Sequence, residues 1–448
     1  MDAIFVLILK LAIVLSVGFI GSLVARKLKL PNVSGYLLFG LLLGPSLGLI
    51  FKGFPGIITV EDSGNLNFIS QIALAFIAFS IGAEFSIKSI KKVGKPILVM
   101  TSTEVLGAVL VVFFAMFFLP KPQAIMPDGY NPFSKPNVAF GLILASMSAA
   151  TAPAATLMVI RQYRAFGPVT RAILPITALD DIFGIVVFGF FISFAQILAS
   201  TGPLPPVWLM ILKPFIEVFG SVALGMIIGL LLSLLANKFD RIRDDLQVLS
   251  LIAVFGTIGL TYLINYYLEP HGLSFSQLLS NIMIGSMIAN IAKRPEKTFN
   301  AINDFATPFY ILFFTLAGAG LDLAILGTTP LLLLIAGVYI LARGFGKWLG
   351  IFVGANVVKA EPTVKKYLGI ALLPQGGVSI GLLAIVYTQM APMYPAISTV
   401  IMLSVLVYET MGPVFAKFAI SKAGEIGGLD RLEQLSSLDG IELTEEGA

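Results

Sequence analysis

The stretch Pro175-Ile-Thr-Ala-Leu-Asp180-Asp181-Ile-Phe-Gly-Ile-Val-Val-Phe188 places two adjacent carboxylates in the middle of an apolar segment. The segment runs from about 172 to 198, which is long enough for a helix to cross the apolar core of a bilayer, about 30 Å thick. A charge at the bilayer centre costs at least about 2.5–3.5 kcal/mol, so two of them indicate a functional site. Because helix neighbours point about 100° apart, we expect one carboxylate to face an ion path and the other a protein partner.

The composition of the whole chain is typical of a membrane protein. Of its 448 residues, 57% are hydrophobic and 12% are charged, and the mean hydropathy is +0.95. Soluble proteins carry about 25% charged residues, so the sequence predicts an all-α polytopic membrane protein. The chain contains no cysteine, which excludes disulfides, thiol chemistry and iron–sulfur clusters.

Thirteen apolar segments are predicted to be transmembrane helices. They cover about residues 4–24, 35–50, 67–83, 96–119, 137–160, 171–197, 214–236, 246–266, 275–292, 303–325, 330–354, 367–389 and 396–417. The connections after odd-numbered segments, together with the tail, hold most of the 29 lysines and arginines. Basic loops stay in the cytoplasm, so the amino terminus is predicted outside and the carboxyl terminus inside. The net charge of +4 reflects this asymmetry and does not indicate a nucleic-acid partner.

Two of these segments carry helix-breaking sequence near their middle. The fifth contains Ser148-Ala-Ala-Thr151-Ala-Pro153-Ala-Ala-Thr156, and the twelfth contains Leu373-Pro374-Gln375-Gly376-Gly377-Val-Ser379. Proline and paired glycines interrupt a helix, and unwound backbone at membrane depth is tolerated where it is buried in protein or lines a cavity. Breaks at matching positions of two oppositely oriented halves predict an inverted-repeat transporter with its site between them.

Two cations and further carboxylates are predicted within the apolar segments. Arg343 and Lys347 are four residues apart, so they share a helix face and need anions nearby. The available anions are the carboxylates of Asp180, Asp181 and Glu104. The alternative is that both cations snorkel to the cytoplasmic surface. Glu409, in the inner half of the last segment, is predicted to line the cytoplasmic entrance.

These motifs resemble the monovalent cation:proton antiporter superfamily, specifically its second family, which includes the bacterial NhaA and NapA sodium–proton antiporters and the Kef systems. The resemblance covers about residues 1–420. Its most specific motifs are Ala-Thr-Ala-Pro-Ala-Ala-Thr at 150–156, Ala-Leu-Asp-Asp at 178–181, Gly-Lys-Trp-Leu-Gly at 346–350 and Pro-Gln-Gly-Gly at 374–377.

The resemblance implies an antiporter fold with two broken helices that cross. It divides the chain into a mobile core at about 96–197 and 330–417, a dimerisation domain at about 1–83 and 246–325, a linker helix at about 214–236 and a short acidic cytoplasmic tail at 421–448. The tail is expected to be partly disordered, and no nucleotide-binding domain follows from its sequence. A homodimer in the plasma membrane is the expected assembly.

The resemblance also implies roles for the site residues. Asp181 would be the principal carboxylate for cation and proton, and Asp180 the second, which pairs with Lys347 when no cation is bound. The transported ion would be bound by Asp181, Asp180 and the hydroxyl of Thr151, together with freed backbone carbonyls, because hard cations prefer oxygen ligands. No cofactor is expected, and the transported ions would be Na⁺ (or K⁺ or Li⁺) and H⁺.

Departures from related branches favour electrogenic exchange. Electroneutral sodium–proton exchangers typically have Asn at the position of Asp180 and Glu at the position of Ile176, and Kef proteins typically have Gln in place of Asp180. The double-aspartate pattern predicts two protons per cation, the second supplied by Lys347 when its partner leaves. Arg343 is not part of the NhaA pattern, and Glu104 is the anion expected beside it.

The sequence thus predicts a secondary active antiporter that exchanges a monovalent cation for protons by alternating access, and not an enzyme. Alternatives are an electroneutral or K⁺-selective exchanger, and a sodium-coupled symporter of organic anions with the same fold. A non-transporting scaffold or sensor is a further alternative. The symporter needs neither a buried lysine nor a carboxylate pair, and the scaffold needs no ionisable group at mid-depth.

Overall fold

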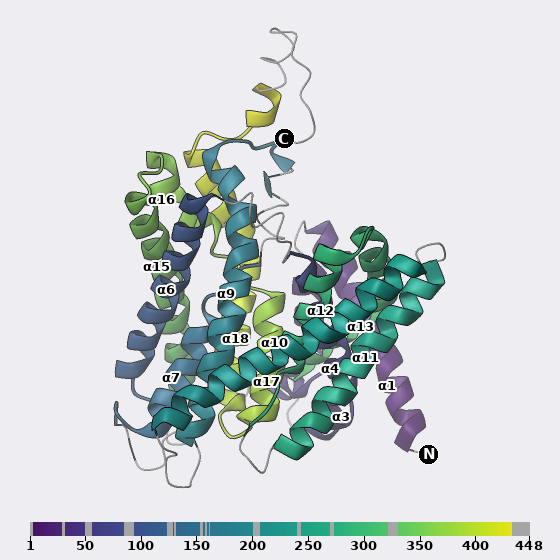
Figure 1. The fold of residues 1–448 in the computed structure, drawn as a ribbon. Helices are drawn as coiled ribbons and strands as arrows, with labels where there is room; N and C mark the ends of the chain where they lie inside the picture. The colour runs from purple at the N-terminus through teal and green to yellow at the C-terminus, as the bar shows by residue number, and fades with distance from the viewer. Residues whose placement is uncertain are drawn as a thin grey trace.

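The structure is a computed structural model of the chain. It describes residues 3–28, 32–49, 56–84, 94–122, 129, 131–152, 156, 159–160, 162–199, 207–239, 243–268, 273–320 and 330–431. These residues form helices joined by loops and contain no strand, which confirms the all-α prediction (Figure 1).

The helices overlap the apolar segments of the sequence, apart from one short polar helix at 60–65. In chain order they are α1 (Ala3–Lys27), α2 (Asn32–Leu41), the 3-10 turn η1 (Pro45–Leu49), α3 (Val60–Asn65), α4 (Asn67–Ile81), the 3-10 turn η2 (Gly82–Glu84), α6 (Lys95–Phe118), α7 (Lys135–Met147), α9 (Pro168–Ala199), α10 (Val207–Lys238), α11 (Arg243–Leu268), α12 (Gln277–Ile291), α13 (Pro295–Ala319), α15 (Pro330–Val357), α16 (Pro362–Ala371), α17 (Gly377–Gln389) and α18 (Tyr394–Lys422). The helix α10 begins before the predicted linker segment of about 214–236.

Two groups of helices lie side by side. One contains α6, α7, α9, α15, α16, α17 and α18, and the other contains α1, α2, α4, α11, α12 and α13. The long helix α10 runs obliquely between them, contacting α9 on one side and α11 and α12 on the other (Figure 1). The helix with the aspartate pair, α9, therefore faces the boundary between the groups.

Seven helices of the described residues are long and apolar enough to span a membrane. The candidate spans within them begin at Phe5, Lys95, Pro168, Phe215, Asp244, Pro330 and Tyr394. Leu106, Leu110 and Phe114 form an exposed apolar stripe along α6, with a spacing that places them on one helix face. Such a face suits lipid contact. The predicted count of thirteen spans is not confirmed, since α2, α4, α7, α12, α16 and α17 are each shorter than a full membrane crossing.

Both predicted helix breaks fall within the described residues, at least in part. The helix α7 ends at Met147 and the residues to 152 are not helical, while 372–376 separate α16 from α17. Pro153 lies outside the described residues. The helix α9 continues through Pro175 without interruption, although proline removes one backbone hydrogen bond.

The first part of the acidic tail packs against the start of α9. The carboxylate of Glu425 accepts hydrogen bonds from the backbone N–H groups of Val169, at 2.7 Å, and Thr170, at 2.8 Å. N–H groups of a first helical turn have no partner within the helix, so Glu425 caps α9. The tail predicted from 421 to be partly disordered thus has an ordered first part, 423–431, and its remainder lies outside the described residues.

Candidate functional site

The two helix breaks contact each other directly. Three hydrogen bonds join them: from the N–H of Ala152 to the carbonyl of Pro374 (3.0 Å), from the hydroxyl of Thr156 to the carbonyl of Ala371 (2.9 Å) and from the side-chain amide of Gln375 to the carbonyl of Met147 (3.3 Å). Backbone groups freed by each break are therefore partly satisfied by the other break. This arrangement meets the requirement that unwound backbone at membrane depth be buried in protein.

The guanidinium of Arg343 lies among carbonyl oxygens from both breaks. Its Nε donates to Ser148 (3.0 Å), Nη1 to Leu373 (2.6 Å) and Nη2 to Ala150 (2.7 Å). The final carbonyls of a helix carry partial negative charge and have no partner within the helix, so a fork of N–H donors suits them. Arg343 has no exposed surface, so it does not snorkel.

The ring of Tyr408 completes the surroundings of Arg343. The guanidinium carbon lies 4.6 Å from the ring centroid, within the range of a cation–π contact. The Tyr408 hydroxyl donates to the carbonyl of Ile340 at 2.6 Å, which holds the ring in place. Sequence reasoning missed Tyr408, because neither its spacing nor its residue type indicates a contact across two helices.

Lys347, one turn after Arg343 on α15, is bound by side chains instead. Its ammonium donates to the carboxylate of Glu104, to the hydroxyl of Thr151 at 2.7 Å and to Oδ2 of Asp180 at 3.3 Å. The hydroxyl of Thr151 in turn donates to Asp180. Lys347, Glu104 and Asp180 have no exposed surface, and Thr151 is 2% exposed. We call these four residues the Lys347 cluster; its lysine, like Arg343, does not snorkel.

The position of Glu104 differs from the one expected. Sequence reasoning placed this carboxylate beside Arg343, but it contacts Lys347, and Arg343 is occupied by carbonyls. The reason is the close approach of α6 and α15. A Cβ on Gly350 would lie 2.3 Å from the carbonyl oxygen of Thr103 and 2.6 Å from Cα of Glu104, so only glycine fits there. This contact sets Glu104 level with Lys347.

Asp180 and Asp181 occupy successive positions of α9 and are both buried, with 0% and 5% exposure. Asp180 contacts Lys347 and Thr151. Asp181 is turned about 100° from it around the helix axis. The pair thus presents carboxylates in two directions from one mid-helix point.

Glu409 lies near the start of the half-helix α17. It is 4% exposed, and a Cβ on Gly376 would come within 2.1 Å of its Oε1. A carboxylate is stabilised at a helix N-terminus by the partial positive charge there. Gly376 therefore leaves room for Glu409, and Gly377 opens the half-helix. The structure thus brings Glu409 to Gly376, at the second break.

Gln375 links the breaks to α18. Its Oε1 accepts from the hydroxyl of Ser404 at 2.7 Å, and its Nε2 donates to the hydroxyls of Ser379, at 2.9 Å, and Tyr339, at 3.3 Å. With both ends of the amide bonded and no exposed surface, Gln375 is held in one orientation. Ser404 and Tyr339 are further contacts that sequence reasoning did not identify.

The predicted site residues thus form one buried group of charges and oxygens. When all are ionised, the carboxylates of Glu104, Asp180, Asp181 and Glu409 outnumber the cations Arg343 and Lys347 by two. A bound monovalent cation would halve this excess of negative charge. Carboxylate and hydroxyl oxygens are the ligands that hard monovalent cations prefer.

The sequence profile of the family described as "Sodium/hydrogen exchanger, transmembrane" matches residues 12–417. The chain belongs to this sodium/hydrogen exchanger family. The matched range runs from α1 to the end part of α18 and so contains both breaks, the aspartate pair and the two buried cations.

Three relatives are identical to this chain at about a quarter of the aligned residues. A Na(+)/H(+) antiporter of Enterococcus hirae is 24% identical over 382 residues, covering 84% of this chain and 88% of the relative. A probable Na(+)/H(+) antiporter 2 of Methanocaldococcus jannaschii is 24% identical over 400 residues, covering 85% and 84%. An ammonium/H(+) antiporter subunit, AmhT, of Alkalihalophilus pseudofirmus is 23% identical over 309 residues, covering 67% and 68%.

The fold of this family member is similar to a solved one. The sodium proton antiporter MjNhaP1 from Methanocaldococcus jannaschii, solved at pH 8, superimposes with a TM-score of 0.70 at 20% sequence identity. The match covers 94% of this chain and 99% of that protein. At this identity the likeness shows the fold alone.

Proposed function

We propose that this protein exchanges a monovalent cation, with Na⁺ as the first candidate, for protons by alternating access at the Lys347 cluster and Asp181. The single observation that carries the proposal is the contact of a buried lysine with one carboxylate of the aspartate pair, beside two crossing helix breaks. Membership of the exchanger family and the names of two relatives support it.

The exchange follows from competition for carboxylate oxygens. A dehydrated cation binds Asp181 and Asp180, with the hydroxyl of Thr151 as a further oxygen ligand. It displaces the ammonium of Lys347 from Asp180, 3.3 Å away, and any proton held by Asp181. On the other side of the membrane a proton reverses these steps. Cation and proton cannot occupy Asp181 together, so their movements are coupled.

Glu104 bears on the number of protons exchanged. Electrogenic exchange, as expected from the double aspartate, requires Lys347 to lose its proton once Asp180 turns to the cation. Glu104 remains as a second anionic partner of Lys347, and an adjacent anion favours the charged form of a lysine. We therefore propose that Lys347 keeps its proton and that one proton is exchanged per cation, so that the cycle moves no net charge.

Further features of the expected architecture stay proposals. We propose that the chain is of the second, NhaA- and NapA-like family, on the motifs Ala-Leu-Asp-Asp and Pro-Gln-Gly-Gly. We also propose that the helix group with α6, α9 and α15 moves against the group with α4, α12 and α13, that the amino terminus is outside, and that the protein is a homodimer. A cysteine at Ser134 should react with an impermeant thiol reagent from outside and one at Ser421 should not; the reverse pattern overturns the orientation.

The test of the function is proton flux in proteoliposomes, with Na⁺, K⁺, Li⁺ and NH₄⁺ added singly. Ammonium is included because one relative is named for it. We expect cation-driven proton movement in the wild type and none in Asp181→Asn, which keeps the shape of the side chain and removes its exchangeable charge. Substantial exchange by a well-folded Asp181→Asn protein would overturn the site, and no exchange by the wild type with any cation would overturn the function.

A further inference from the structure

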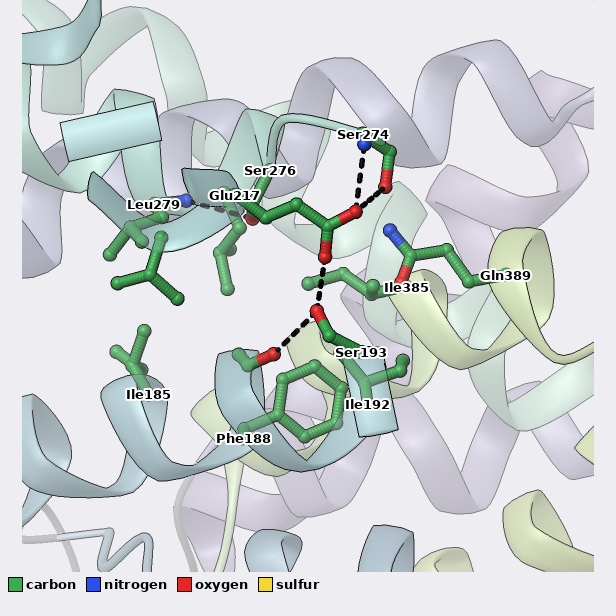
Figure 2. A pocket seen from close by; sticks show the side chains of 13 residues that line it. Ile185, Phe188, Ile192, Ser193, Glu217, Ser274, Ser276, Leu279, Ile385 and Gln389 are labelled. Carbon is green, nitrogen blue, oxygen red and sulfur yellow. Dashed lines mark hydrogen bonds between the residues drawn. The ribbon is translucent and has the colours of Figure 1, made fainter. Parts of the chain in front are cut away.

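A buried carboxylate outside the Lys347 cluster joins the two helix groups. Glu217 on α10 is 5% exposed. Its Oε2 accepts a hydrogen bond from the hydroxyl of Ser193 on α9, and its Oε1 accepts from the N–H (2.8 Å) and hydroxyl (3.3 Å) of Ser274, just before α12 (Figure 2). Lys213, one turn earlier on α10, has its ammonium 3.8 Å from Oε1. Sequence reasoning passed over Glu217, although an acidic residue within an apolar segment is a sufficient signal.

The link from α10 to α12 is stronger than the link from Glu217 to α9. Toward α12, the hydroxyl of Ser221 accepts from the N–H of Ser276 at 2.7 Å, and the hydroxyl of Ser280 donates to the carbonyl of Ser221 at 2.9 Å. These two bonds add to the two that Ser274 donates to Glu217. Because four hydrogen bonds join α10 to the start of α12, we treat this part of the two helices as one rigid unit.

Toward α9, the carboxylate of Glu217 is held by a single hydroxyl. The Oγ of Ser193 also lies 3.1 Å from the carbonyl of Gly189 on its own helix. A serine hydroxyl carries one proton, so Glu217 and Gly189 compete for it. Ser193 can therefore give up Glu217 and keep a partner, whereas Ser274 has its N–H directed at Glu217. Of the hydrogen bonds that Glu217 makes, the one to Ser193 is therefore the one that costs least to open.

A cavity lies beside this bond, between the two helix groups. It has a volume of about 30 Å³ and is lined by residues of α9, α10, α12 and α17, among them Phe188, Leu279, Ile385 and Gln389 (Figure 2). Protein interiors are normally packed without such spaces, and this volume is enough for water beside polar groups. The boundary is thus incompletely filled at the point where the two groups are joined by a breakable bond.

We propose that Glu217 is a positioning residue for the transport step. Its bond to Ser193 holds α9 against α10 and α12 in the conformation described here, and this bond opens when α9 moves. Ser193 and Asp181 both lie on α9. Ser193 follows Asp181 by twelve residues, which corresponds to about 18 Å along the helix axis. A shift of the aspartate pair therefore moves Ser193 too. The inference rests on the proposed antiport function and on movement of the two helix groups against each other.

The first test measures opening of the boundary without any flux. The chain has no cysteine, so Leu279→Cys places a single thiol in the cavity, at a position 4% exposed. In purified protein, Ser193→Ala should raise the rate of maleimide labelling at this thiol roughly tenfold, the effect of losing one hydrogen bond to a charged group. Ser233→Ala is the matched control, because that buried hydroxyl on α10 donates to Gly229 of its own helix. Equal labelling rates in Ser193→Ala and the control would overturn the proposal.

The second test locks the boundary. A Cβ on Gly189 would lie 3.1 Å from Cγ2 of Val218, so cysteines at these two positions are within reach of a disulfide. Oxidation of Gly189→Cys/Val218→Cys should stop cation–proton exchange and reduction should restore it. Undiminished exchange in the fully oxidised protein would show that α9 does not move against α10. Absence of exchange in the wild type would overturn the proposed function. The labelling test measures no exchange, so its result would still decide the proposal on Glu217.

Discussion

Two neighbouring regions along one face of α15 differ in what surrounds their buried cation. Around Arg343 the contacts are backbone carbonyls of both helix breaks and the ring of Tyr408. Around Lys347, one turn later, they are two carboxylates and a hydroxyl. Both cations lack exposed surface. Two cations that are equally buried on the same helix face therefore have different kinds of partner.

The difference follows from which partner can change its charge. Carbonyls at helix ends carry a permanent partial charge, and arginine, which stays protonated in proteins, gives them a permanent cation. Carboxylates gain and lose protons or cations, and lysine is a compact donor whose own protonation responds to its neighbours. We infer that the Arg343 region holds the breaks together and that the Lys347 region carries out the exchange.

The largest effect is expected from Lys347→Gln. Two buried carboxylates, Glu104 and Asp180, would lose their cation, which should lower the free energy of unfolding by about 3–5 kcal/mol and abolish exchange. Thermal unfolding in detergent and proton flux in proteoliposomes measure the two effects. Lys366→Gln, on an exposed part of α16, is the control and should leave both unchanged. Wild-type exchange in Lys347→Gln would remove the distinction between the two regions.

Arg343→Lys should come next, since it keeps the charge but loses the fork of N–H donors. Two of the carbonyl contacts would be lost, each worth about 1.5 kcal/mol as a hydrogen bond to a charged group, so we expect a loss of roughly 3 kcal/mol in stability. The test is thermal unfolding of Arg343→Lys beside the wild type. An unchanged unfolding temperature would mean that a point charge suffices and that the geometry of the guanidinium is unimportant.

Glu104→Gln should change the type of exchange. With Glu104 neutral, Lys347 has no anion once the cation binds Asp180, and burial then favours the deprotonated amine. We expect exchange that ignores voltage in the wild type and responds to it in Glu104→Gln, because one net charge per cycle is worth about 2.3 kcal/mol per 100 mV. Sodium-driven proton flux at clamped potential measures this, with the exposed Glu296→Gln as control. Voltage-dependent exchange in the wild type would restore the expectation of electrogenic transport.

The smallest effect is expected at a pair formed by Lys10, near the start of α1, and a carboxylate that lies outside the membrane-spanning helices. Asp62, in the short helix α3, accepts hydrogen bonds from Lys10 and Thr59. Burial alone would raise the pKa of Asp62, but these bonds outweigh it, and the pKa lies below its usual value. A lowered pKa contributes stability that is present above the ordinary pKa of an aspartate and is lost as pH falls through the lowered one.

Asp62→Asn should therefore cost about 1 kcal/mol at neutral pH, the usual worth of a helix cap, and nothing in acid, where Asp62 is protonated. Unfolding of both proteins across this pH range measures the difference, and proton flux should be unaffected. If Asp62→Asn lowered the free energy of unfolding as much as Lys347→Gln does, then burial would not make the ion pair at the Lys347 cluster more important for stability.

Much of the fold and part of the candidate site were readable from local chemistry. Charge within apolar segments is costly in a membrane, so Asp180, Asp181 and Lys347 could be singled out without a structure. Pro374 and its neighbouring glycines likewise indicated a broken helix, because their effect on the backbone is intrinsic. These features depend on a residue and its immediate neighbours in the chain.

The partners of these residues were decided by the tertiary structure alone. Glu104 contacts Lys347 rather than Arg343 because α6 and α15 meet through Gly350, and Arg343 contacts carbonyls because the two breaks meet. The capping of α9 by Glu425 and the bond between Glu217 and Ser193 are of the same kind. Each depends on the relative height and rotation of helices far apart in the chain. Those quantities are set by packing over the whole length of each helix, which no local pattern of residues records.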